Sequence, residues 1–141
     1  MQIVFLGTSC MVPTKERNVS SVFLSYKTEG ILFDCGEGTQ RQMNIAGIKR
    51  TRVTKIFISH WHGDHVSGII GLLQTMGNDE DTPKVEIFGP KGTMDHMKGL
   101  MNACVFQARV DLKVHELEPK NIEKCLDMPE FYVECGYLNH T

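Results

Sequence analysis

Short apolar segments alternate with longer segments of helical periodicity along this chain. The apolar segments carry β-branched and aromatic residues and predict strands at residues 2–6, 21–26, 31–34, 55–59, 85–88, 110–114 and 131–138. Apolar positions three and four residues apart predict helices at residues 39–47, 66–76 and 93–104. Strands that alternate with helices in this way favour an α/β layered domain over a helical bundle or a β-sandwich.

Several small residues mark where these elements should end. The turn at residues 27–30 should join two strands as an antiparallel hairpin. Gly47 suits the left-handed position that ends a helix, and Gly89-Pro90 should stop the strand before it. Thr93 is a plausible helix cap, and the acidic stretch at residues 78–83 should be a solvated loop.

Composition restricts the class of protein further. The chain has 141 residues, of which 41% are hydrophobic and 23% charged, so it should form one globular domain. A formal net charge of -2 gives no reason to expect indiscriminate binding to nucleic acid or membranes, and no apolar run is long enough to span a membrane. The N-terminus has no basic leader region, which indicates a cytoplasmic location, and the five scattered cysteines indicate reduced, mostly buried thiols.

The six residues 60–65, directly after the predicted strand at 55–59, carry the clearest chemistry. His60 and His62 should point to the same side of an extended segment, and Gly63 allows the turn that brings Asp64 and His65 beside them. Imidazole nitrogen and carboxylate oxygen are zinc ligands, and the lack of a nearby cysteine favours a catalytic site with an open position.

Other residues are weaker candidates for the same site. His140 ends the last predicted strand and could add a ligand, whereas His96 and His115 have no ligand-type neighbours and are interpreted as ordinary, partly exposed residues. Asp34 could cap a helix or bond within its loop, or it could accept a hydrogen bond from a ligating histidine. The acid-free segment at residues 41–55 holds five basic residues, which could bind phosphates or simply form a solvated connection.

The motif His-x-His-x-Asp-His at residues 60–65 resembles the hallmark of the metallo-β-lactamase superfamily. Four blocks narrow the resemblance to its tRNase Z branch: Phe-Leu-Gly-Thr at 5–8, Pro-x-Lys-x-Arg-Asn at 13–18, Phe-Asp-Cys-Gly-Glu-Gly-Thr-Gln at 33–40, and the metal motif extended by Gly-Ile-Ile-Gly-Leu-Leu at 68–73. The short string at residues 136–140 is similar to the third motif of the family.

This resemblance implies an αββα sandwich, of which the chain forms mainly the first αβ half. It implies that His60, His62 and His140 hold one zinc ion and that Asp64 and His65 belong to a second. Asp64 would be the catalytic proton acceptor, and Lys15, Arg17 and Asn18 would handle the RNA. The implied reaction is two-metal phosphodiester hydrolysis that removes the 3′ trailer from precursor tRNA.

The same resemblance implies that residues 1–141 are the N-terminal part of a longer metallo-β-lactamase-like domain and that the chain is truncated. We expect such a part to bind at most one zinc strongly, to cleave little or no RNA, and to form homodimers through an uncovered apolar sheet face. Two other functions stay open. One is a metallo-hydrolase of the same superfamily that acts on small phosphodiesters, thioesters or lactones, and the other is a non-catalytic assembly module.

Overall fold

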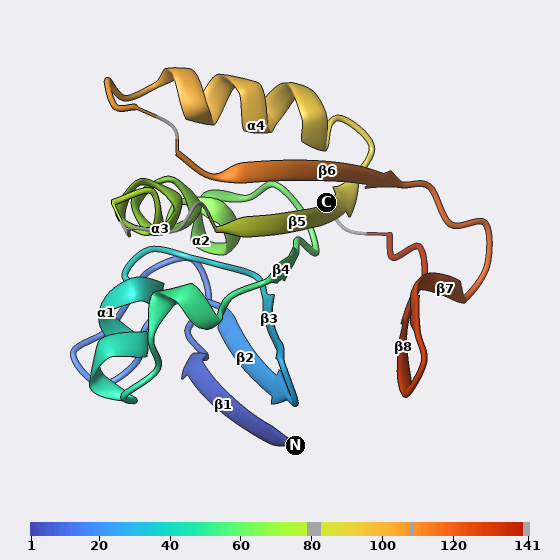
Figure 1. Cartoon of the computed structure of the whole chain (residues 1–141), viewed down its shortest axis with the longest axis horizontal. Coiled ribbons are helices and arrows are strands. Elements are labelled where there is room, and N and C mark those ends of the chain that lie inside the picture. The colour runs from blue at the N-terminus through green and yellow to red at the C-terminus, as the bar shows by residue number, and fades with distance from the viewer. Residues whose placement is uncertain (79–82, 108, 140–141) are drawn as a thin grey trace.

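A mixed six-stranded sheet forms the centre of the computed structural model, which describes residues 1–78, 83–107 and 109–139 (Figure 1). Its strands follow one another in chain order: β1 (Gln2–Gly7), β2 (Ser21–Tyr26), β3 (Glu29–Phe33), β4 (Lys55–Phe57), β5 (Lys84–Pro90) and β6 (Asp111–Leu117). The pairs β1–β2 and β2–β3 are antiparallel, and the pairs from β3 to β6 are parallel. Parallel strands end at one edge, which is where functional loops of α/β sheets collect.

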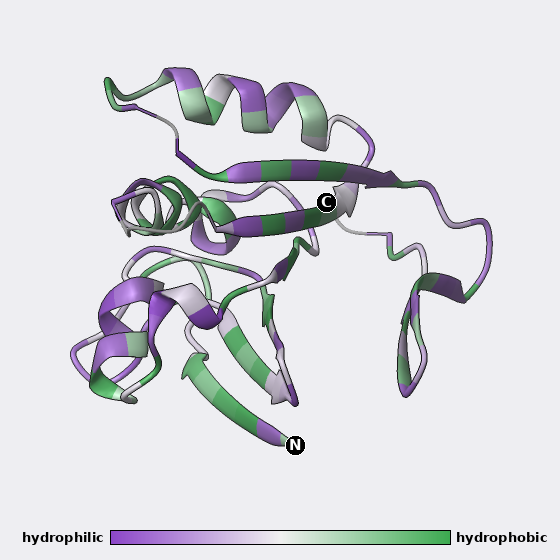
Figure 2. Cartoon of the chain, viewed as in Figure 1, coloured by the Kyte–Doolittle hydropathy of each residue, from purple (hydrophilic) through white to green (hydrophobic). Residues whose placement is uncertain are grey.

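The helices are short and pack against one face of the sheet. They are α1 (Thr39–Ile45), α2 (Gly63–Val66), α3 (Ile69–Met76) and α4 (Thr93–Asn102), with a 3-10 turn η1 at Arg50–Arg52. The main core lies between this layer and the sheet, where Leu32, Ile56 and Ile87 meet Leu72 and Leu73 of α3 with no exposed surface. In Figure 2, hydrophobic and hydrophilic residues alternate along β6 and the first half of β5. Within the described ranges, no helix has the length and apolar character needed to cross a bilayer.

The opposite sheet face is partly covered by a separate two-stranded hairpin. Its strands are β7 (Glu123–Met128) and β8 (Phe131–Cys135), and Figure 1 shows it apart from the helices. The hairpin side chains of Leu126, Phe131 and Val133 pack against a cluster that includes Phe57 and Phe88. This cover reduces the open apolar face expected from the sequence, but Ile3 and Phe5 on β1 remain 51% and 70% exposed.

A buried lysine links three strands on that second face. Lys55 is 5% exposed, and its Nζ lies 2.6 Å from Glu29 Oε2 and 3.8 Å from Glu86 Oε1. Burial raises the pKa of the Glu29 carboxyl, but hydrogen bonds from Lys55 and Thr54 and the Lys55 charge outweigh it, so that this pKa lies below its ordinary value. The charges therefore stabilise one another within the sheet instead of facing a ligand.

Most strands lie where the sequence predicts them, including the β2–β3 hairpin, and Gly47 ends the α1 segment at a φ of 70°. The helix expected at residues 66–76 is instead divided into α2 and α3. Its break falls at Gly68, whose N–H donates to Cys35 O over 2.9 Å, and a Cβ on Gly68 would lie 2.1 Å from Gly36 O. A tertiary contact with the 35–38 turn thus overrides the helical pattern.

Other boundaries also differ from the expectations. The strand β5 continues through Gly89-Pro90, where it pairs with β6, and β4 ends at Phe57, two residues earlier than expected. Gly92, with a φ of 90°, is the helix-capping position in place of Thr93. The strand β7 was not predicted, and β8 ends at Cys135, so residues 136–139 are not strand. Residues 79–82 of the expected acidic loop lie outside the described residues.

Candidate metal centre

The loop after β4 brings two histidine rings into contact. His60 Nε2 lies 3.0 Å from His62 Nδ1, and the ring centroids are 4.5 Å apart. The other nitrogen of His60, Nδ1, lies 3.0 Å from Ser59 Oγ. An extended segment directs alternate side chains to one side, which is why the His-x-His spacing produces this pair.

Asp64 and His65 form a second pair in the first turn of α2. Asp64 Oδ2 lies 3.4 Å from His65 Nε2 and accepts a hydrogen bond from Met11 N over 2.8 Å. This backbone hydrogen bond from Met11 has the largest effect on the pKa of the Asp64 carboxyl and lowers it. Burial opposes this effect, the charges of His65 and His60 add to it, and the pKa lies below its ordinary value. Asp64 is therefore an ionised acceptor at neutral pH. The rings of His60 and His65 are also neighbours, with centroids 4.1 Å apart.

These two pairs have the right donor chemistry for divalent cations. Two ligands of one tetrahedral zinc, each about 2.0–2.2 Å from the ion, lie about 3.3–3.6 Å apart. The separations of 3.0 Å and 3.4 Å are close to this value. Within the part of the chain that the structure describes, no three His, Cys, Asp or Glu side chains converge to hold an ion. Each pair thus supplies two ligands and requires others, and His140 lies outside the described residues.

Asp34 contacts His65 of the second pair and joins it to Ser59 in the loop after β4. Its Oδ2 lies 2.6 Å from His65 Nδ1 and accepts from Ser59 Oγ over 2.9 Å, and its Oδ1 accepts from Ser59 N over 2.8 Å. Ser20 Oγ also donates to Oδ2 over 3.3 Å. Asp34 has a left-handed backbone, with φ of 59°, a conformation that aspartate tolerates better than most residues. The carboxylate fixes the orientation of His65 and leaves the Nε2 atom of that ring facing Asp64.

The loop between β1 and β2 carries the three residues expected to contact RNA. Lys15 and Arg17 are exposed. Asn18 differs from them because its Nδ2 donates to Glu37 O over 2.6 Å and its backbone oxygen accepts from Thr8 N and Ser9 N. Asn18 thus holds the base of the loop, and the Met11 hydrogen bond attaches the tip of the same loop to Asp64.

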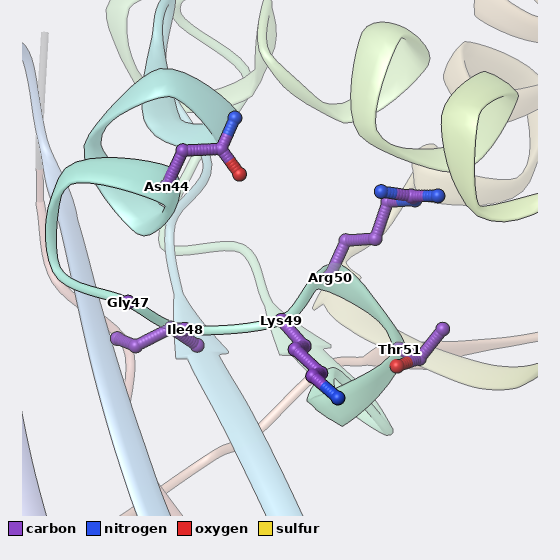
Figure 3. A pocket seen from close by; sticks show the side chains of 6 residues that line it. All are labelled: Asn44, Gly47, Ile48, Lys49, Arg50 and Thr51. Atoms are coloured by element: carbon purple, nitrogen blue, oxygen red, sulfur yellow. The ribbon is translucent and has the colours of Figure 1, made fainter.

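The basic segment at residues 41–55 is divided by the fold. Lys55 is buried with Glu29 on the second sheet face, and Arg52 donates to Ser25 Oγ and Lys27 O. A pocket of about 390 Å³ opens beside this segment, lined by Asn44, Gly47, Ile48, Lys49, Arg50 and Thr51. Figure 3 shows the side chains of Lys49 and Arg50 pointing in different directions, and Arg50 Nε donates to Thr75 O over 3.2 Å. The five basic residues do not form one cationic face.

Sequence reasoning missed several contacts around the centre. Met11 acts through its backbone N–H, which leaves no trace in the residue type, and Ser59 bridges Asp34 and His60. Of the histidines set aside, His115 Nε2 lies 2.8 Å from Glu86 Oε2 on the second sheet face. The register of β5 and β6 places His115 opposite Phe88, so its contact with Glu86 is a diagonal one between the two strands.

Comparisons with known proteins agree with this architecture. Residues 1–124 match the family model described as Anti-Pycsar protein Apyc1. The chain is 40% identical over 141 residues to ribonuclease Z of Methanococcus aeolicus, a match that covers 100% of the chain and 44% of that protein. It is 44% identical over 137 residues to ribonuclease Z of Thermococcus gammatolerans, covering 96% of the chain and 44% of the relative. The chain therefore spans less than half the length of these curated relatives.

Solved structures give the same fold. Human tRNase Z, short form, superposes with a TM-score of 0.86 at 36% identity, over 95% of this chain and 59% of that one. The metallo-β-lactamase fold protein YhfI from Bacillus subtilis superposes with a TM-score of 0.65 at 16% identity, over 94% of this chain and 54% of that one, which shows the fold alone. The predicted α/β metallo-β-lactamase fold is confirmed.

Proposed function

We propose that this chain, which belongs to the family described by the Anti-Pycsar protein Apyc1 model and corresponds to the N-terminal part of ribonuclease Z, contributes to a zinc-dependent endoribonuclease that removes the 3′ trailer from precursor tRNA. The observation that carries the proposal is the presence of two donor pairs, at 3.0 Å in the loop after β4 and at 3.4 Å in the first turn of α2. The chain would form the N-terminal part of a metallo-β-lactamase domain over residues 1–141.

In this proposal each pair belongs to a different zinc ion. His60 and His62, with His140 as an expected third ligand, would hold one, and Asp64 with His65 would hold the other. Bound zinc lowers the pKa of water and stabilises the attacking and leaving oxygens of a phosphodiester. Because each described pair lacks further ligands, we expect the chain by itself to bind at most one zinc strongly.

The residues of the chain would perform four further tasks. Asp64, held in place by the Met11 N–H, would accept a proton during hydrolysis. Asp34 keeps His65 in one ring orientation. Lys15 and Arg17 bind phosphates of the RNA from the exposed loop, and Asn18 keeps that loop in place.

Cleavage of a precursor tRNA with a 3′ trailer tests the function, using protein expressed from the complete reading frame. Asp64→Ala should abolish cleavage while the protein stays folded. The exposed Lys98→Ala on α4 should be harmless, whereas Lys15→Ala with Arg17→Ala should weaken RNA binding and reduce its salt dependence. Full activity in the Asp64→Ala variant would show that cleavage does not depend on this site. It would refute the proposal and favour a non-catalytic assembly module whose metal site is vestigial.

A small-molecule hydrolase is the alternative, supported by the name of the matching family model, which is not that of a ribonuclease. Turnover of bis-p-nitrophenyl phosphate without cleavage of precursor tRNA would favour it. The loop with Lys15 and Arg17 argues for RNA, because a small phosphodiester does not require two cations on an exposed loop.

We also propose a cytoplasmic location and a homodimer. The five cysteines are free, which fits a reducing compartment. Ile3 and Phe5 on the edge strand β1 are exposed apolar side chains that a second copy could cover. Sedimentation of the Phe5→Lys variant as a monomer, when the unaltered chain sediments as a dimer, would support this surface.

A further inference from the structure

Trp61 stands between the two histidines of the first donor pair, but its side chain extends the other way. Its ring packs against the core between the sheet and the helices. The indole Nε1 donates to Thr93 Oγ1 over 2.8 Å, and the ring lies beside His96 with centroids 4.9 Å apart and planes at 33°. Trp61 therefore attaches the metal loop to the first turn of α4.

The residues around Thr93 hold its hydroxyl in place for the contact with Trp61. Thr93 is fully buried, and its hydroxyl donates to Pro90 O over 2.6 Å, which leaves the oxygen to accept from the indole. A Cβ on Gly89 would lie 2.5 Å from Thr93 Oγ1, so the close approach of Thr93 requires glycine there. Gly92 turns the chain into α4 with a φ of 90°. The hydroxyl is thus fixed in direction and position.

We propose that Trp61 is a positioning residue that, through Thr93, sets the directions of His60 and His62 toward a shared cation. Side chains alternate along an extended segment, so fixing the middle residue of His60-Trp61-His62 limits the backbone torsions that orient both imidazoles. Ligands held in place by neighbouring groups bind a metal more tightly than mobile ones. The inference rests on the proposed role of His60 and His62 as metal ligands.

Zinc affinity measured without substrate tests the inference, with Zn²⁺ alone as the probe and competition against a chromophoric chelator. Thr93→Val preserves shape but removes the acceptor, and Trp61→Phe removes the indole N–H. Both should weaken Zn²⁺ binding about tenfold or more, as loss of groups that orient ligands does. Thr93→Ser should restore the affinity. Thr51→Val, an exposed position on η1, is the matched control.

The outcomes separate this inference from the proposed function. If the unaltered chain binds no Zn²⁺, the inference fails, and cleavage of precursor tRNA by the complete protein still decides the proposed function. If it binds Zn²⁺ and a folded Thr93→Val variant binds equally well, only the role of Trp61 fails. A contact with a purely structural role would lower the thermal stability of the metal-free chain and leave the affinity of the folded protein unchanged.

A readout without any substitution covers the case in which a variant does not fold. Trp61 is the only tryptophan, so its emission reports on this position alone. Saturation with Zn²⁺ should change the intensity or the wavelength of this emission, because the ligands on both sides of the indole become fixed. Unchanged emission at saturation would overturn the inference.

Discussion

Replacement of Asp34 by asparagine should destabilise the protein by about 2 kcal/mol. Asp34 is 8% exposed, and its carboxylate accepts from Ser59 N and Ser59 Oγ and contacts His65 Nδ1 at 2.6 Å. Asparagine keeps the size, the acceptor for the backbone N–H and the tolerance of the left-handed φ of 59°. What it loses is the charged partner of His65, and hydrogen bonds to charged groups contribute about 1.5–3 kcal/mol.

Asp34→Ala should cost more, about 4 kcal/mol. Alanine leaves the N–H of Ser59 and the ring of His65 without an acceptor. It also has no polar side chain that could form a local hydrogen bond and so stabilise the left-handed backbone at this position. Domains are stabilised by about 5–15 kcal/mol in total. The alanine variant should therefore be partly unfolded in mild denaturant, whereas the asparagine variant should unfold cooperatively.

Urea unfolding followed by Trp61 emission measures these differences as shifts of the midpoint at constant slope. Glu37→Gln is the matched control, because Glu37 is an exposed carboxylate in the same turn as Asp34 and its side chain accepts none of these bonds. The control should stay within about 0.5 kcal/mol of the unaltered chain. Equal midpoints for Asp34→Asn and the control would refute the assigned role of the Asp34 charge.

Three further predictions concern stability and reactivity. Gly68→Ala should destabilise the protein strongly, because the new Cβ would lie 2.1 Å from Gly36 O. Gly71→Ala in α3 places its Cβ in open space and should stabilise the protein by about 0.5–1 kcal/mol. Equal melting temperatures of the two variants would contradict this. Because the pKa of Glu29 is lowered in the folded protein, its ionised carboxylate contributes fully to the free energy of unfolding at neutral pH, and this contribution is lost as the pH falls below about 4. The difference in stability between the unaltered chain and Glu29→Gln should therefore vanish at acidic pH and persist at high pH. Burial raises the pKa of the Cys35 thiol to about 12, so iodoacetamide should label exposed Cys10 and spare Cys35 in the native protein, as peptide mass spectrometry would report.

Sequence patterns predicted the fold where local signals and tertiary packing agree. Strands β1, β2 and β4 have apolar residues in the expected places, and the hairpin turn lies at residues 27–28. The strand β7 escaped detection because only Cys125 and Leu126 in Glu123–Met128 are apolar apart from its last residue. The break at Gly68 depends on backbone atoms of Gly36, a neighbour that no periodicity in the segment itself reveals.

The candidate site divides in the same way. Residue types and spacing predicted that the side chains of residues 60, 62, 64 and 65 lie together, and they do, because they are adjacent in sequence. Their role as ligands stays a prediction. Contacts between distant segments could not be predicted from the sequence. One example is the hydrogen bond from the Trp61 indole to the hydroxyl of Thr93, 32 positions away. The burial of Lys55 could not be predicted either, and it means that this lysine of the basic segment cannot contact RNA.

The hydrogen bond from Met11 N to Asp64 Oδ2 joins two tasks that the sequence presents separately. Asp64 is the proposed proton acceptor, and Met11 belongs to the loop that carries the exposed Lys15 and Arg17. Met11 holds an unfavourable left-handed φ of 58°, and such outliers persist only where surrounding contacts impose them. In the proposed function, a phosphate that displaces this loop would alter the orientation of Asp64, and this would couple RNA binding to proton transfer through one backbone N–H.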